Sequence, residues 1–264
     1  MKESAPLLDA GKLPRLITEM ERLRYIENAP SVHGVYIVTA PFSSIVPVVD
    51  EQIVQEANPW AVFSHSTAMT HHGLTNDIPR RIVANFFASP RRNRIPLNTT
   101  PDDWLDLELP RGSRPNHAGS VRVQWIRIKD EFDFGHCVST SQGISIYVTD
   151  IERTLLDGLR APSKCGGISS VLHAWKNAAK RIDLNRLIEY TIRFDNSVLR
   201  QRVGFLLELT GLKHPILKEW RKSLLRGGSV RLVAQAPYAS NHSERWNLSL
   251  NVPSGLLEEL AENQ

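Results

Sequence analysis

The chain has 264 residues, of which 41% are hydrophobic and 23% are charged, and its formal net charge is +4. These values are typical of an ordinary soluble globular protein with one large domain, or with a large domain and a small one. No stretch approaches 18 consecutive apolar residues, the start lacks the apolar core of a secretory signal, and the two cysteines are too few for a disulfide framework or a four-cysteine zinc site. We therefore expect a cytoplasmic protein without a membrane-spanning segment.

The positive charge is concentrated in the middle of the chain. Residues 80–129 contain ten Lys or Arg against four Asp or Glu, a net +6, which leaves −2 for the remainder. Nine of the ten cations are arginines, whose planar guanidinium group suits bidentate recognition of phosphates. A polyanionic partner is therefore expected.

The first predicted element is an amphipathic helix that starts near Gly11 or Lys12. Its apolar residues recur at helical spacing, and Pro14 is tolerated only in the first turn of a helix. Four residues on the polar side of this helix could face a DNA groove: Lys12, Arg15, Thr18 and Arg22. A solvated helix face is an equally good explanation of the same pattern.

Two short strands are expected after this helix, at residues 24–27 and 32–38, around the turn-forming residues 28–31. A helix followed by a hairpin is the second half of a winged helix–turn–helix, in which the helix enters the major groove and the hairpin is the wing. Only about a dozen residues precede the helix here, too few for the two further helices of such a module. We therefore expect a partial winged-helix domain at 1–42 and a second domain at 43–264.

The second domain is expected to begin with helices and strands in mixed order. The pattern predicts helices at 45–58 and 64–72, and strands at 81–88, 121–129 and 143–149. The loop between the first two strands contains three arginines that could contact phosphates without reading sequence: Arg91, Arg92 and Arg94. A solubilising loop is the alternative explanation.

The rest of the chain is expected to be mostly helical. Residues 144–149 alternate as in a half-buried strand and pass directly into a helix, where Thr149 and Glu152 have the spacing of a capping box. Arg153 and Asp157, four apart, can pair on one face of that helix. Further helices are expected at 167–180, 183–194, 197–212 and 215–226, and two last strands at 229–234 and 245–252. This order of elements predicts an α+β fold.

The run VTDIERTLLDGL at 148–159, followed by Cys165-Gly166-Gly167-Ile168, resembles the AbiEi-like antitoxins and transcriptional regulators of type IV toxin–antitoxin (abortive infection) systems. Three further pieces agree in the same order: FSHSTAMTHHGL at 63–74, RVGFLLELTGL at 202–212 and RWNLSLNVP at 245–253. The resemblance implies a winged helix followed by a domain related to a minimal nucleotidyltransferase fold. It also implies binding to DNA of the protein's own promoter region, and opposition to a cognate nucleotidyltransferase toxin encoded in the same operon without a stable complex.

Catalytic chemistry is weakly indicated, and we expect no catalytic residue, metal or cofactor. A nucleotidyltransferase needs a Gly-Ser turn followed closely by two carboxylates one residue apart, and only Glu131 and Asp133, a whole strand after Gly119-Ser120, have that spacing. His71 and His72 adjoin, so on a helix they point about 100° apart and cannot easily share a metal.

A serine–histidine pair around residues 64–72 lacks the Gly-x-Ser-x-Gly elbow of a hydrolase. Two alternatives to the regulator remain open: a nucleotidyltransferase-like enzyme that uses Glu131 and Asp133, and a protein-interaction subunit of a defence complex.

Overall fold

The expected helix and hairpin are present at the start of the chain. The computed structural model describes residues 11–39, 48–87, 94–141, 144–224 and 229–262. Helix α1 spans Leu13–Arg22, with Pro14 in its first turn, and strands β1 (Ile26–Asn28) and β2 (Tyr36–Val38) pair in antiparallel fashion. Both strands are shorter than expected.

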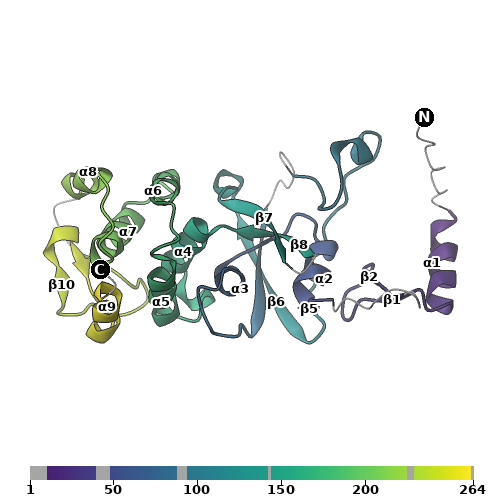
Figure 1. Ribbon diagram of the computed structural model, residues 1–264, viewed down its shortest axis with the longest axis horizontal. Helices are drawn as coiled ribbons and strands as arrows, with labels where there is room; N and C mark the ends of the chain where they lie inside the picture. Colours follow the sequence, from purple (N-terminus) through teal and green to yellow (C-terminus); the bar gives the residue numbers. More distant parts are fainter. Residues whose placement is uncertain (1–10, 40–47, 88–93, 142–143, 225–228, 263–264) are drawn as a thin grey trace.

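The turn of the hairpin anchors it to the rest of the molecule. Ala29 and Val32 are buried in the same apolar cluster as the large sheet. Ser31 Oγ donates to the carbonyl oxygen of Gly119 at 3.1 Å, and the Gly119 amide donates to Pro30 at 3.0 Å. Helix α1, in contrast, contains no buried residue. The hairpin is therefore held by the sheet, while α1 stands at the end of the molecule (Figure 1).

A six-stranded mixed sheet forms the centre of the molecule, in the order β5-β6-β4-β3-β8-β7. The pairs β4/β6 and β3/β8 are parallel, and the others are antiparallel. The strands are β3 (Val62–Phe63), β4 (Arg81–Phe87), β5 (His117–Ala118), β6 (Val121–Ile128), β7 (His136–Ser141) and β8 (Ile144–Thr149).

Strand alternation gives the sheet two different faces. Helix α2 (Asp50–Ala57) covers one face through Ile53 and Val54, which join Val148 in a buried cluster. Tyr147, the neighbour of Val148, points to the opposite face. The helix expected at 45–58 is therefore present but begins at Asp50, with Val49 as its N-cap, and residues 45–47 lie outside the described residues. Helix α3 (His65–His71) is present as expected, whereas strand β3 before it was not predicted.

The second half of the chain is a helical layer beside the sheet, as expected. It contains α4 (Ile151–Arg160), α5 (Ile168–Ala178), α6 (Leu184–Arg193), α7 (Ser197–Leu209) and α8 (Ile216–Lys222), all of which were predicted, and α9 (Ser254–Ala261), which was not. A small sheet of two-residue strands, β9 (Val230–Arg231), β10 (His242–Ser243) and β11 (Leu248–Ser249), completes this end. Short 3₁₀ turns lie at Pro101–Trp104, Asp130–Phe132, Pro162–Lys164 and Glu244–Trp246.

The main core lies among these helices, and Trp175 and Trp246 are fully buried in it. Gly204 on α7 allows the close approach of Trp246, because a Cβ atom at this position would overlap the indole ring. The last strands are shorter than the sequence predicts, because residues 244–246 form a 3₁₀ turn instead of continuing a strand.

The observed architecture is an α+β fold, in agreement with the sequence-based expectation. Its elements follow the chain along the long axis of the molecule, from α1 through the six-stranded sheet to the helices (Figure 1). Within the described ranges, no helix is both long and apolar enough to cross a membrane.

Candidate functional site

The junction between β8 and α4 is capped differently from the expected capping box. Asp150 is the N-cap, and its carboxylate accepts a hydrogen bond from the Arg153 amide at 2.8 Å. Thr149 instead bonds Thr154 Oγ1 at 2.7 Å, and the buried Glu152 accepts from the amide of Asp183 at 2.7 Å. The prediction was wrong because Glu152 turns towards the start of α6 and leaves the capping position to Asp150, a strongly preferred N-cap residue.

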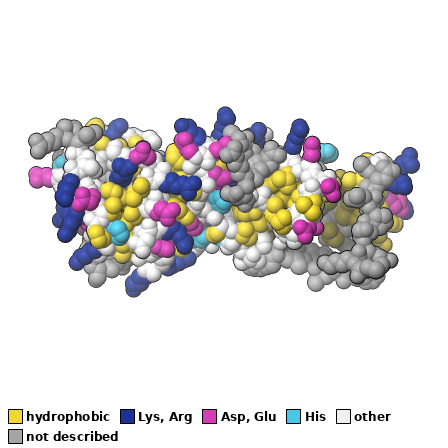
Figure 2. Space-filling model, turned by 90° about the horizontal axis from the view of Figure 1, so that it is seen from above, with side chains coloured by type: hydrophobic (Ala, Val, Ile, Leu, Met, Phe, Trp, Pro, Cys, Tyr) yellow, Lys and Arg dark blue, Asp and Glu magenta, His cyan; other side chains and the backbone are white. Residues whose placement is uncertain are grey.

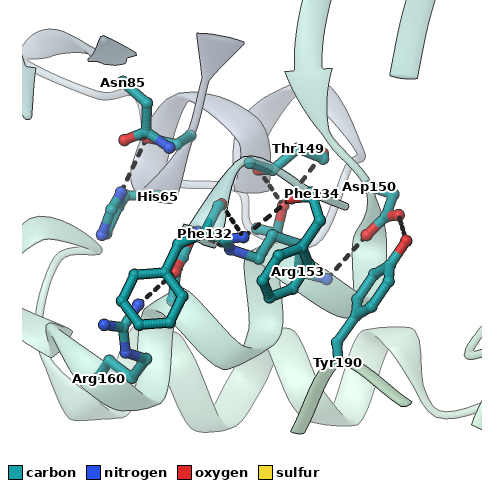
Figure 3. Close-up of polar contacts among 12 residues, drawn as sticks. His65, Asn85, Phe132, Phe134, Thr149, Asp150, Arg153, Arg160 and Tyr190 are labelled. Carbon is teal, nitrogen blue, oxygen red and sulfur yellow. Dashed lines mark hydrogen bonds and ion pairs between the residues drawn. The ribbon is translucent and has the colours of Figure 1, made fainter. Parts of the chain in front are cut away.

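Arg153 and Asp157 pair as the sequence indicated, and the structure shows that the ion pair is buried. Their side chains are 1% and 2% exposed, and Arg153 Nε donates to Asp157 Oδ2 at 3.0 Å. Arg153 NH1 also donates to the carbonyl oxygens of Phe132 and Phe134, both at 2.9 Å (Figure 3). The guanidinium group thus has partners on α4 and on the segment that enters β7, as a buried charge requires.

Aromatic rings enclose this guanidinium group. The Arg153 Cζ atom lies 4.6 Å from the ring centre of Phe134 and 4.7 Å from that of Phe194. Arg160 stacks on the Phe194 ring at 4.2 Å, and Arg193 stacks on Phe134 at 4.2 Å. Cation–π contacts of this kind contribute roughly 0.5–2 kcal/mol each. The junction therefore links α4, α6 and the entry to β7.

Tyr190 completes the junction from α6. Its hydroxyl group donates to Asp150 Oδ2 at 2.9 Å (Figure 3). Burial raises the pKa of Tyr190, and the negative charge of Asp150 raises it further. A phenol that is harder to ionise and already donates to a carboxylate acts as a structural hydrogen-bond donor rather than as a base.

The Ser64–His65 pair has no geometry for a nucleophile. Ser64 Oγ donates to Asn85 Oδ1 at 2.9 Å, so the 2.9 Å contact with His65 Nδ1 requires the histidine to donate. Burial lowers the pKa of His65 to about 4, which keeps the ring neutral at pH 7. A nitrogen that donates to the serine cannot remove the serine proton, so the arrangement joins α3 to β4 rather than activating Ser64.

His71 and His72 bond two different strands. His71 Nε2 contacts Ser139 Oγ on β7 at 2.7 Å, and His72 Nε2 donates to the Thr149 carbonyl oxygen on β8 at 2.6 Å. Both rings therefore hold the end of α3 against the sheet.

Arg94 is buried, although the sequence predicted an exposed arginine loop. Its side chain is 5% exposed, and NH2 lies 3.1 Å from Asp133 Oδ2. Its Cζ atom stacks 4.6 Å from the ring centre of Phe87. The carboxylate partner and the aromatic surface draw this arginine inwards. Arg91 and Arg92 lie outside the described residues.

Glu131 and Asp133, the candidate metal-binding pair, have separate partners. Glu131 is exposed and lies 3.4 Å from Lys129 Nζ, whereas Asp133 binds Arg94 and accepts from His136 Nε2 at 2.9 Å. Burial alone would raise the pKa of Asp133, but the His136 hydrogen bond and the Arg94 charge outweigh it and hold the pKa below its ordinary value. The Asp133 carboxylate thus already binds the Arg94 guanidinium group and the His136 ring.

The four remaining predicted site residues lie together on α1 or at its start. Lys12 and Arg15 are exposed. Arg22 Nε donates to Glu19 Oε2 at 2.9 Å, and Thr18 Oγ1 donates to the Pro14 carbonyl oxygen at 2.9 Å. The structure therefore groups Lys12, Arg15, Thr18 and Arg22 at one end of the molecule and places Arg94 apart from them, at the central sheet.

The sequence analysis did not identify a second basic cluster, formed by Lys213, Lys218, Arg221 and Arg245, which lies at the opposite end of the molecule's long axis from α1. Three of these residues lie within 213–221, on α8 or just before it, but Arg245 comes from the 3₁₀ turn at Glu244–Trp246, so no local motif contains the whole cluster. A systematic count of lysines and arginines without an i, i+3 or i, i+4 acidic partner would have been the one usable signal.

Comparison with known proteins adds information on the fold. No family model and no curated protein matches the chain. The crystal structure of the RV2827C protein from Mycobacterium tuberculosis is similar, with a TM-score of 0.57 and 14% sequence identity, over 94% of this chain and 82% of that chain. At this identity the similarity shows a shared fold alone.

Proposed function

We propose that the chain is a cytoplasmic DNA-binding transcriptional regulator, an antitoxin of the AbiEi-like kind that represses its own operon. The observation that carries the proposal is α1: a helix without a buried residue, at the end of the molecule and directly before a hairpin, whose first turn presents the exposed cations Lys12 and Arg15. An α-helix fits the major groove of B-DNA, and a hairpin beside it can contact the backbone as a wing.

The anchoring of the hairpin supports this proposal. Residues 29–32 hold the turn on the sheet through burial and two hydrogen bonds, so the wing would keep one orientation while α1 enters the groove. Lys12 and Arg15 would supply the main phosphate contacts, because Arg22 is already paired with Glu19. Phosphate contacts position a protein on DNA and make its affinity depend on salt.

Arg91 and Arg92, which lie outside the described residues, remain proposed phosphate contacts. The role we propose for Arg94 is to anchor its own position on the sheet through Asp133, rather than to touch a phosphate itself.

The first experiment is fluorescence anisotropy of the protein on its own upstream DNA and on a scrambled duplex, at two salt concentrations. The proposal expects tight binding to the upstream DNA, and a loss of affinity in Lys12→Ala/Arg15→Ala. The matched control is Lys129→Ala/Lys180→Ala, which removes two exposed lysines elsewhere. Equal affinity for the two duplexes would show contact with the DNA backbone without operator recognition, and would contradict the proposal that the chain is a repressor. The absence of binding to either duplex at low salt would contradict it as well.

The antitoxin part of the proposal has its own test. Co-expression with the nucleotidyltransferase-type toxin encoded in the same operon should restore growth, in line with a role in phage defence. If growth stays arrested while the repressor still binds its operator, the chain is a regulator without antitoxin activity.

A second candidate, a protein-interaction subunit of a defence complex, is favoured by the apolar side of the same helix. Leu13, Leu16 and Leu23 are 46%, 40% and 43% exposed, which is unusual for a leucine stripe. This candidate predicts a stable co-purifying partner that is lost in Leu13→Ser/Leu16→Ser, together with no affinity for DNA.

A further inference from the structure

A basic cleft of about 550 Å³ lies at the end of the molecule opposite α1. It is bounded by the end of α7, the following loop, α8 and the 3₁₀ turn at Glu244–Trp246. Four cations line it: Lys213, Lys218, Arg221 and Arg245. Figure 2 shows lysines and arginines gathered at this end of the molecule.

Glu208, the one carboxylate among the lining residues, is already fully engaged. Its Oε2 atom accepts from Trp246 Nε1 at 2.8 Å and from Arg245 Nε at 3.0 Å, while Oε1 lies 3.4 Å from Arg221 NH1. One negative charge can balance only one of the two arginines. Glu208 therefore holds both guanidinium groups at the wall of the cleft and leaves one positive charge uncompensated.

The two lysines add charge that no carboxylate balances. Lys213 and Lys218 are exposed, and neither ammonium group has a hydrogen bond or ion pair with another residue in the described part of the chain. The lining thus carries four positive charges against one negative charge, a net +3. A cleft lined by one sign of charge concentrates ligands of the opposite sign.

Three apolar side chains line the cleft beside Gly211 and His214. Leu212, Pro215 and Leu217 contribute to the same cleft. A concave site with an apolar wall, a few charged groups and a volume between roughly 300 and 1,000 Å³ has the character of a small-molecule site.

We propose that this cleft binds the phosphates of a mononucleotide. Lys213 and Lys218 contact the phosphate chain, Arg245 adds a guanidinium held in place by Glu208, and the base lies against the apolar wall. Guanidinium and ammonium groups are the usual protein partners of phosphate. The site goes beyond the DNA-binding function proposed above, and its place at the opposite end from α1 makes it independent of a duplex held by that helix.

The test is fluorescence anisotropy of the full chain with N-methylanthraniloyl-ATP. Saturable binding is expected, with an affinity roughly tenfold or more lower in Lys213→Gln/Lys218→Gln, because this variant removes two of the four cations that line the cleft. Both lysines are exposed, so the variant should fold, which its thermal unfolding curve checks. The control is Lys129→Gln/Lys222→Gln, which removes the same charge from two exposed lysines outside the cleft and should bind normally.

Competition distinguishes the sources of phosphate. Unlabelled ATP should displace the probe fully, tripolyphosphate should displace it more weakly, and adenosine should fail. No saturable binding, an equal loss in the control variant, or displacement by a 12-base-pair duplex but not by ATP would each overturn the proposal. Failure here leaves operator binding by α1 unaffected, because Lys12 and Arg15 remain in place.

Discussion

Arg153 Nε and Asp157 Oδ2 lie 3.0 Å apart within α4, and both side chains are almost completely buried. Four neighbours in space depend on this pair: the carbonyl groups of Phe132 and Phe134, and the rings of Phe134 and Phe194. The pair therefore connects the helical layer with the sheet, and its loss should be felt in the stability of the whole molecule.

Removing the acidic partner should strongly destabilise the protein. Asp157→Ala leaves the Arg153 charge buried without its carboxylate, which lowers the free energy of unfolding by about 3–5 kcal/mol. Urea unfolding followed by circular dichroism measures the change. Glu219→Ala, which breaks the exposed pair with Lys222, is the control and should change stability by less than about 1 kcal/mol. Similar losses in both variants would show that burial of the pair is unimportant.

A methyl group at Gly204 should also destabilise the protein. The Cβ atom of Gly204→Ala overlaps the ring of Trp246, so α7 and the indole must move apart, at about 1–3 kcal/mol or more. Gly255→Ala on α9 is the matched control, because nothing lies near its Cβ position and alanine is the better helix former. Chemical denaturation should give a lower free energy of unfolding than the wild type for Gly204→Ala and a higher one for Gly255→Ala. A Gly204→Ala variant more stable than the wild type would contradict the packing argument.

The free energy of unfolding should decrease as the pH decreases, because His65 titrates differently in the folded and unfolded chains. Its pKa is about 4 in the folded protein against an ordinary value of 6.5, so between these values the unfolded chain binds more protons. The contribution is fully present above pH 6.5 and is lost as the pH falls towards 4, by roughly 3 kcal/mol in total.

His65→Asn should flatten this part of the pH profile. Asparagine tolerates the left-handed backbone at this position, where φ is 52°, and does not titrate. The free energy of unfolding is measured by urea titration from pH 4.5 to 7.5, with the exposed His242→Asn as control. An unchanged slope in His65→Asn would assign the pH dependence to other groups.

Releasing Arg22 from its acidic neighbour should strengthen DNA binding. Glu19 lies on the exposed surface of α1 and pairs with Arg22, and its negative charge opposes phosphates. Glu19→Gln should therefore raise the affinity for the upstream duplex a few-fold at low salt, measured by anisotropy. Glu258→Gln on α9 removes the same charge from another helix and should have no effect. If Glu19→Gln instead binds the upstream duplex with lower affinity than the wild type, α1 does not lie against the DNA.

The sequence alone predicted most of the elements. Helices α4 to α8 begin within one residue of their expected starts, because apolar residues at helical spacing and local signals such as Gly166-Gly167 act over one or two turns. The α+β class followed from the order of these elements. The small sheet was harder to predict, since strands of two residues carry too little pattern.

Only the tertiary structure decided which charges are buried and which are free. Arg94 and Arg153 resemble surface arginines in the sequence, but Asp133 and the rings of Phe87, Phe134 and Phe194 surround them after folding. The cleft cations come from α8 and from two segments more than 30 residues apart in the chain, Lys213 and Arg245. Contacts between distant segments depend on how helices pack, and the local spacing of residues does not contain that information.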